Sequence, residues 1–164
     1  MTLSIAVLAL GTVVVATNDA RAETPLVGKV EDAIRSTKPG WRCTRGIFNG
    51  PPPVVSSEKT LVVEAWDHTS ESGKRERVEV RIFQVDNRID AKMSLSPVRE
   101  GQVATGWKIE GLKIGDEGYL STFKNGKRFE IQFRKGTIVV TVGSDSFPLV
   151  DGFAQLIAAE IDTT

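Results

Sequence analysis

The sequence is poor in the residue types that most often carry catalysis or bind metal ions. Its 164 residues include a single cysteine, Cys43, and a single histidine, His68. One cysteine excludes an intramolecular disulfide, and two such residues far apart in the sequence do not supply the four ligands of a structural zinc site. We expect Cys43 to be a small buried apolar residue beside Trp41 on a strand. A free reactive thiol and an intermolecular disulfide are the alternatives.

An excess of charge of either sign is also missing. Lysine and arginine together number 21, aspartate and glutamate number 21, and the formal net charge is 0. Such a chain has no overall positive field to attract nucleic acid, and it has no acidic bias typical of a disordered segment. Nucleic acid is therefore not among the expected partners.

Sequence motifs for cofactors and for nucleophilic catalysis are missing as well. The chain has no Gly-x-Ser-x-Gly motif, and its glycines do not form a glycine-rich loop between a strand and a helix. The acidic stretches 85–90 and 115–118 do not follow the alternating ligand pattern of a calcium loop, and Asp116 is expected to stabilise a turn instead. We therefore predict neither a cofactor nor a bound metal ion.

The N-terminal segment has the features of a signal peptide. Residues 3–16 form an apolar run that is shorter than the roughly 20 residues of a membrane-spanning helix. Ala20 and Ala22 supply the small side chains that a signal peptidase accepts, although no lysine or arginine precedes the run. We predict that residues 1–22 are removed and that residues 23–164 form one exported domain, periplasmic or secreted, without a transmembrane segment. An uncleaved anchor and a buried N-terminal segment are the alternatives.

Amphipathic patterns predict helices at both ends of this domain. Thr24 and Pro25 are typical of a helix start, with Thr24 as the cap, and the stretch 38–40 ends that helix. A second helix is predicted at the C-terminus, where Pro148 lies near the start. The apolar residues expected to face inward are Leu26, Val27, Val30, Ala33 and Ile34 in the first helix and Leu149, Phe153, Leu156, Ile157 and Ile161 in the second.

A shorter helix is predicted in the middle of the chain. Asp86 or Asn87 caps it, and it runs to about Ser94, followed by a loop. Ile89 and Met93 are expected to face inward.

Apolar side chains predict strands over residues 41–48, 59–66, 75–85 and 107–113. The second and third of these form a hairpin, and the proline-rich stretch 49–58 is an extended loop. Within the third strand, the residues expected to face inward are Val78, Val80 and Ile82.

Two tight turns predict a three-stranded meander over residues 117–142. An Asn-Gly turn at 125–126 pairs Leu120 with Ile131, and a turn at 135–136 pairs Ile131 with Val140. Because cross-strand partners share a face, both turns place the same apolar side chains inside. The other pairings expected are Phe123–Arg128, Thr122–Phe129, Tyr119–Gln132, Gly118–Phe133 and Glu117–Arg134 from the first turn, and Phe133–Ile138 and Phe129–Val142 from the second.

Together these elements predict an α+β domain. It has an antiparallel sheet of about five or six strands, with the N-terminal and C-terminal helices packed on it. Helix 24–37 is expected to cover the partly polar face of the sheet.

Three stretches carry a family resemblance: GDEGY at 115–119, FRKGTIVVTVG at 133–143 and FAQLIAAEID at 153–162. With the order of the predicted elements, they resemble small exported bacterial domains of uncharacterised function. Those domains in turn resemble the PsbP-like α/β/α sandwich, which is named for a subunit of the photosystem oxygen-evolving complex. The similarity covers residues 60–162. It implies a non-catalytic accessory or binding role and assigns no functional residue.

The outer face of the predicted sheet is the best candidate for a binding surface, because aromatic and arginine side chains are enriched at protein interfaces. We expect it to bind an envelope protein or a small ligand. The residues of this predicted surface are Arg75, Arg77, Arg81, Tyr119, Phe123, Arg128, Gln132 and Arg134. The alternative is that a helix covers Tyr119 and Phe123 while the arginines are solvated.

Two other functions fit parts of the sequence. A hydrolase or isomerase would use His68 with Glu64 or Asp67, and Glu64 and Glu79 could form a carboxylate pair across the hairpin. A structural or assembly protein of the cell envelope would add a strand to the sheet edge. Because the motifs of catalysis are otherwise missing, we predict a non-catalytic binding or accessory domain.

Overall fold

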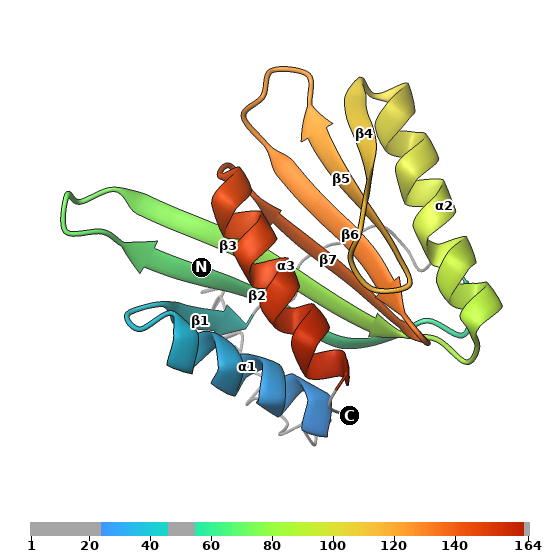
Figure 1. Ribbon diagram of the computed structural model, residues 1–164, viewed down its shortest axis with the longest axis horizontal. Helices are drawn as coiled ribbons and strands as arrows, with labels where there is room; N and C mark the ends of the chain where they lie inside the picture. Colours follow the sequence, from blue (N-terminus) through green and yellow to red (C-terminus); the bar gives the residue numbers. More distant parts are fainter. Residues whose placement is uncertain (1–23, 46–54, 163–164) are drawn as a thin grey trace, which may run out of the picture.

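The computed structural model describes residues 24–45 and 55–162 (Figure 1). The predicted signal peptide, residues 1–22, lies outside the described residues, as does most of the proline-rich loop 49–58. Within the described ranges, no helix combines the length and the apolar character needed to cross a membrane.

In the part of the chain that the structure describes, one antiparallel sheet of seven strands forms the centre of the fold, in the order β1-β2-β3-β7-β6-β5-β4. The α+β prediction is confirmed, with slightly more strands than the five or six expected. The strands are β1 (Arg42–Arg45), β2 (Lys59–Thr69), β3 (Arg75–Gln84), β4 (Trp107–Leu112), β5 (Glu117–Phe123), β6 (Phe129–Lys135) and β7 (Ile138–Ser144). The predicted hairpin is the pair β2–β3, in which Val78, Val80 and Ile82 are fully buried as expected.

Three helices among the described residues cover the sheet from two sides. Helices α1 (Pro25–Thr37) and α3 (Phe147–Asp162) lie side by side on one face, where their apolar residues join one core with Val80, Ile131 and Val142 (Figure 1). Helix α2 (Arg88–Ala104) packs on the opposite face. The prediction that helix 24–37 covers the partly polar face is therefore wrong, because its apolar stripe completes the core beside α3.

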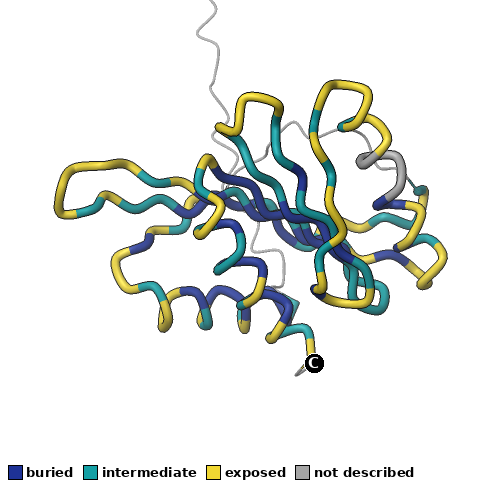
Figure 2. The backbone as a smooth tube through the Cα atoms, turned by 45° about the horizontal axis from the view of Figure 1, so that its top comes forward, coloured by how far each residue is buried: buried dark blue, intermediate teal, exposed yellow. Residues whose placement is uncertain are grey.

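Burial follows these layers closely (Figure 2). The central strands and the inward sides of α1 and α3 are buried, whereas the tip of the β2–β3 hairpin is exposed. Helix α3 buries Val150, Phe153, Ala154, Ile157 and Ala158. The predicted stripe of this helix is thus correct at Phe153 and Ile157, which are fully buried, and at Leu149 and Ile161, which pack against the core while partly buried; small alanines complete the buried face.

Helix α2 is longer than predicted and faces the sheet with other residues. Asn87 is the cap, and its Oδ1 atom accepts hydrogen bonds from the backbone N–H groups of Ile89 and Asp90 at 2.9 Å. The helix then continues to Ala104 rather than to Ser94. Its buried apolar residues are Ala91 and Leu95, while Ile89 and Met93, which were expected inside, are 73% and 53% exposed.

The register of the first predicted turn is confirmed at every pair, including Leu120 opposite Ile131. The turn itself is a four-residue loop in which the Phe123 N–H donates to Arg128 O at 2.9 Å. Only Gly126 takes a positive φ, of 67°. Asn125 contributes its side chain, which accepts from the Lys127 N–H at 2.9 Å.

The second turn is displaced by one residue from its predicted position. Lys135 opposes Ile138, so Gly136 and Thr137 form the loop, and Gly136 takes a φ of 59°. Ile131 therefore opposes Val142 instead of Val140. The pairing shifts by two positions, and because the strand period is two residues, the predicted inward face is unchanged.

Candidate functional site on the sheet face opposite α1 and α3

The predicted binding surface lies on the sheet face opposite α1 and α3, but helix α2 divides it. Alternation along β3, β5 and β6 places Arg77, Tyr119 and Gln132 on that face. Helix α2 packs over the part formed by β6 and β7. The predicted residues therefore belong to two regions, one under or beside the helix and one open to solvent.

The region under α2 is closed by a polar network. Gln102 of α2 donates to Glu130 Oε1 at 2.7 Å, and it accepts from the Ser121 hydroxyl at 2.7 Å. Gln132 also donates to Glu130 Oε1 and is 2% exposed. Tyr119 packs against the apolar residues beneath α2. In this region a helix covers Tyr119, as in the alternative given for the predicted surface.

Phe123 and Arg81 lie outside this network. The Phe123 ring packs against the Trp107 ring, with 5.2 Å between centroids, at the end of the β4–β5 hairpin. Arg81 lies on β3, opposite Val63 of β2 and Thr141 of β7. Phe123 contacts one other predicted position through its backbone, because its N–H donates to Arg128 O at 2.9 Å.

Arg134 is bound within a set of internal contacts at the end of β5. Its Nε lies 3.1 Å from Glu117 Oε2, and its Nη1 lies 3.4 Å from Asp116 Oδ2. The Tyr119 hydroxyl donates to Glu117 Oε1 at 2.6 Å, and this bond, followed by Arg134, lowers the pKa of Glu117. Asp116 Oδ2 also accepts from the Gly136 N–H at 2.9 Å, so its predicted role in a turn is confirmed.

Three of the predicted arginines converge on an open groove of about 380 Å³, which we call the charged groove. Arg77 Nη1 lies 3.4 Å from Asp67 Oδ1, and Arg77 Nε lies 3.8 Å from Glu79 Oε1. Arg128 Nη2 lies 2.6 Å from Glu79 Oε2. The groove is lined by Asp67, Arg75, Glu76, Arg77, Arg128 and Asp145.

A glycine lets Arg128 reach across the sheet into this groove. Arg128 precedes β6, Glu79 lies on β3, and Gly143 of the intervening strand β7 is the cross-strand partner of Glu79. A Cβ atom at Gly143 would lie 2.8 Å from Arg128 Nη2. The bare backbone at this position therefore leaves the space that the guanidinium occupies.

The groove carries side chains of both charge signs, and one of its arginines has no ion-pair partner within the described ranges. Arg77 and Arg128 are fixed by the carboxylates of Asp67 and Glu79. Arg75 is exposed and forms no ion pair within the described ranges. An exposed arginine beside two oriented guanidiniums and neighbouring carboxylates can bind a ligand that carries groups of both signs.

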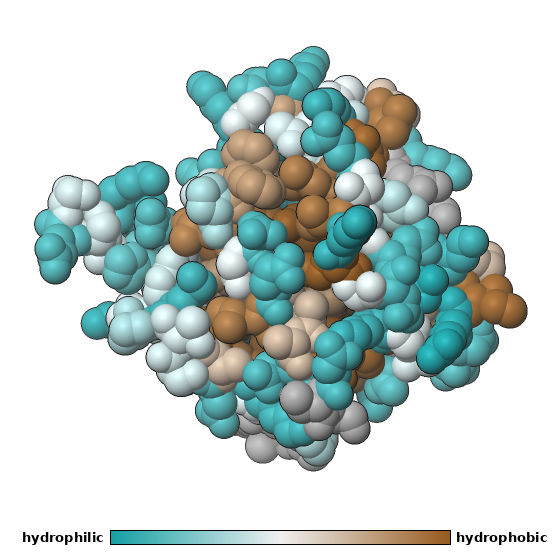
Figure 3. Space-filling view, viewed as in Figure 1, coloured by the Kyte–Doolittle hydropathy of each residue, from teal (hydrophilic) through white to brown (hydrophobic). Residues whose placement is uncertain are grey.

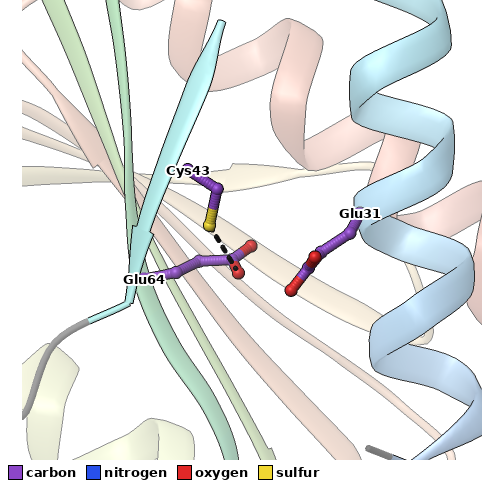
Figure 4. Close-up of side chains that lie close together, drawn as sticks. All are labelled: Glu31, Cys43 and Glu64. Atoms are coloured by element: carbon purple, nitrogen blue, oxygen red, sulfur yellow. Dashed lines mark hydrogen bonds between the residues drawn. The ribbon is translucent and has the colours of Figure 1, made fainter.

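A second polar cluster lies between α1 and the sheet (Figure 4). Glu31 from α1, Cys43 from β1 and Glu64 from β2 place one ligand-type atom each within 4.8 Å of one another. Glu64 is 1% exposed, and its two oxygens accept from Trp66 Nε1 at 2.7 Å and from Cys43 Sγ at 3.4 Å. The hydrogen bonds of the cluster thus involve β1 and β2, and Glu31 of α1 lies beside them and forms an ion pair with Arg35 of its own helix.

This environment makes Cys43 different from the buried apolar residue that was expected. The side chain is only partly buried and donates a hydrogen bond to Glu64. Burial and the Glu64 carboxylate raise the pKa of the thiol to about 12. Since the thiolate is the reactive form of cysteine, the thiol is not poised as a nucleophile.

The carboxylates suggested for catalysis do not meet. His68 stacks on Trp41 with 5.3 Å between ring centroids, and its carboxylate neighbour within the described chain is Glu76, 3.4 Å away. Glu64 opposes Val80, whereas Glu79 opposes Ala65. Glu64 and Glu79 therefore point to opposite faces, and the proposed carboxylate pair is wrong.

Apolar surface gathers on the other side of the molecule, between α3 and β5 (Figure 3). Leu120 and Phe129 are partly buried there, and Phe147, 37% exposed, packs against Phe129 with 5.9 Å between centroids.

Comparisons with protein-family models, with curated proteins and with solved structures found no match to this chain. The resemblance to the PsbP-like sandwich therefore stays a prediction.

Proposed function

We propose that this protein is an exported, non-catalytic binding domain and that the charged groove is its ligand site. The observation that carries the proposal is the convergence of Arg75, Arg77 and Arg128 on one open groove with acidic side chains. Export rests on the predicted signal peptide of residues 1–22. A binding or accessory role also agrees with the family resemblance of residues 60–162.

The arrangement of the groove favours a ligand with a carboxylate next to a basic group. Arg77 and Arg128 are oriented before a ligand arrives, because they form ion pairs with Asp67 and Glu79. Oriented guanidiniums bind carboxylates by charge-assisted hydrogen bonds at a reduced entropic cost. Asp145 provides the opposite charge on the same groove. A peptide segment of an envelope protein, with acidic and basic side chains in sequence, has this chemistry.

The proposal is tested with Arg75→Glu, which reverses the charge of an exposed arginine that forms no ion pair within the described ranges. Binding of mixed-charge peptides to the mature protein is measured by calorimetry and by capture from an envelope extract. We expect the affinity to fall at least about tenfold, the effect of losing one charge-assisted hydrogen bond. Added salt should also weaken binding by the wild-type protein, because salt screens the interaction between charges.

Lys113→Glu is the matched control. Lys113 is exposed in the β4–β5 connection, away from the groove, and its substitution changes the net charge by the same amount. Equal binding by wild type and Arg75→Glu, or equal loss in both variants, would contradict the assignment of the groove.

A further inference from the structure

Strand β4 is a free edge of the sheet. It pairs with β5 on one side, and the sheet order within the described chain places no strand on its other side. Strand β4 has six residues, Trp107–Leu112, and is longer than β1 at the opposite edge, which has four. An edge strand of this kind presents backbone N–H and C=O groups that another strand can pair with.

An apolar groove of about 520 Å³ runs along this edge, between α2 and β4, which lie side by side in Figure 1. Val103 of α2 is 59% exposed beside it. Gly111 of β4 places no side chain in this groove. The space beside it is open, since a Cβ atom there would meet nothing within 4 Å. The lining residues are Glu100, Val103, Ala104, Ile109, Gly111 and Tyr119.

We propose that two copies of this chain associate by antiparallel pairing of their β4 strands, centred on Ile109. This pairing extends the sheet continuously through both copies. It places Lys108 opposite Glu110 of the second copy, and Trp107 opposite Gly111 of the second copy. The inference goes beyond the proposed function, because the charged groove is built on strands that β4 does not contact.

The charged side chains of β4 favour this register over the neighbouring ones. Lys108 and Glu110 are both exposed and lie on one face of β4, where they form an ion pair at 2.7 Å. Antiparallel pairing centred on Ile109 gives two further pairs of opposite charge across the interface. A register centred on Lys108 would oppose two lysines, and one centred on Glu110 would oppose two glutamates, which is destabilising.

Shape supports the same register on the other face of the strand. Trp107 is packed on Phe123, so its ring is already oriented at the start of β4. In the proposed pair, this ring lies over the bare backbone of Gly111 in the second copy and covers the apolar groove there. A large aromatic side chain opposite an edge glycine is a known stabilising combination in sheets.

The interface is small, so association is expected to depend on protein concentration. Sedimentation velocity of the mature protein, measured over a wide concentration range, should show a monomer–dimer equilibrium. Lys108→Glu should weaken dimerisation by about tenfold or more, because it opposes like charges at two positions. Because the side chains of Lys108 and Glu110 are both exposed, the Lys108→Glu substitution should leave the circular dichroism spectrum and the melting temperature unchanged.

Charge complementation makes the test specific to this register. Lys108→Glu alone and Glu110→Lys alone each oppose like charges, but an equimolar mixture of the two variants restores both pairs of opposite charge. We expect heterodimers in the mixture and recovered homodimers in the double variant K108E/E110K. A wild type that is monomeric at all concentrations, a Lys108→Glu variant that dimerises normally, or a mixture without heterodimers would each overturn the proposal.

Discussion

Arg128 Nη2 lies 2.6 Å from Glu79 Oε2, although 49 positions separate the two residues in the sequence. The contact joins the β5–β6 loop to β3 and crosses Gly143 of β7 on the way. One wall of the charged groove therefore depends on a glycine that is not among the residues lining the groove.

Gly143→Ala tests this dependence. The added methyl group would approach the tip of the flexible Arg128 side chain rather than the backbone, so the guanidinium can move away. We expect stability to stay within about 1 kcal/mol of wild type, since partly exposed ion pairs contribute little. The coupling between Arg128 and Glu79, measured by a double-mutant cycle, should disappear. Gly111→Ala, measured on protein dilute enough to be monomeric, is the control, because the space at that strand position is open in the single chain.

Glu64→Ala should destabilise the domain markedly. The substitution leaves the Trp66 indole N–H and the Cys43 thiol without their acceptor in a buried site. An unsatisfied buried donor costs about 1–3 kcal/mol, so we expect a loss of about 2 kcal/mol or more in urea unfolding. Glu64→Gln keeps one acceptor for Trp66 and should lose less. Glu71→Ala, in the exposed tip of the β2–β3 hairpin, should have no measurable effect.

The thiol of Cys43 should make the folded protein less stable at alkaline pH. Its pKa is about 12 in the folded protein and 9.0 in an unperturbed thiol. Between these values the unfolded chain releases the proton and the folded chain retains it, so stability falls as the pH rises above 9.0. Urea unfolding of wild type and Cys43→Ala at about pH 8 and about pH 10.5 should show a steeper loss in the wild type. Equal slopes would contradict the raised pKa.

Tyr119→Phe should raise the pKa of Glu117 toward its ordinary value. The Tyr119 hydroxyl is the first cause of the lowered pKa, and Arg134 is a further one. A lowered pKa means that the charged form of Glu117 stabilises the fold above the unfolded pKa, and that this stability is lost as the pH falls through the folded pKa. The variant should therefore have a smaller acid-dependent loss. A carboxyl carbon titration of Glu117 by NMR measures the pKa directly. Part of the lowering should remain in the variant, because Arg134 still lies beside Glu117.

The sequence predicts the sheet better than it predicts what covers the sheet. The Asn-Gly stretch at 125–126 fixes the pairing of Leu120 with Ile131, because the register depends only on where the loop is centred. The second loop is centred one residue later, at Gly136 and Thr137, and no apolar pattern distinguishes the two registers. The inward face is the same in both.

Helix placement depends on packing that a local pattern does not contain. The stripe of α1 shows that the helix is amphipathic, but not which face of the sheet it covers. Helix α2 was expected to end near Ser94, so its closure of Ser121 and Gln132 was not predicted.

The candidate site was predicted in part. Arg75, Arg77 and Arg128 do converge, whereas Arg134 is bound by Glu117 elsewhere. Asp67, Glu79 and Asp145 were not assigned to the surface. An isolated glycine in a strand, Gly143, was the available signal, since such glycines often mark the close approach of another group.

The order of the strands has a consequence for assembly of the chain. Every neighbouring pair in the sheet is consecutive in sequence except β3 and β7. The β2–β3 hairpin and the β4–β7 meander can each form from nearby residues, and one seam joins the two halves. Helix α3, the last described element, packs across that seam on β3, β6 and β7. A growing polypeptide therefore lacks the helix that covers the β3–β7 seam until residues 147–162 have emerged.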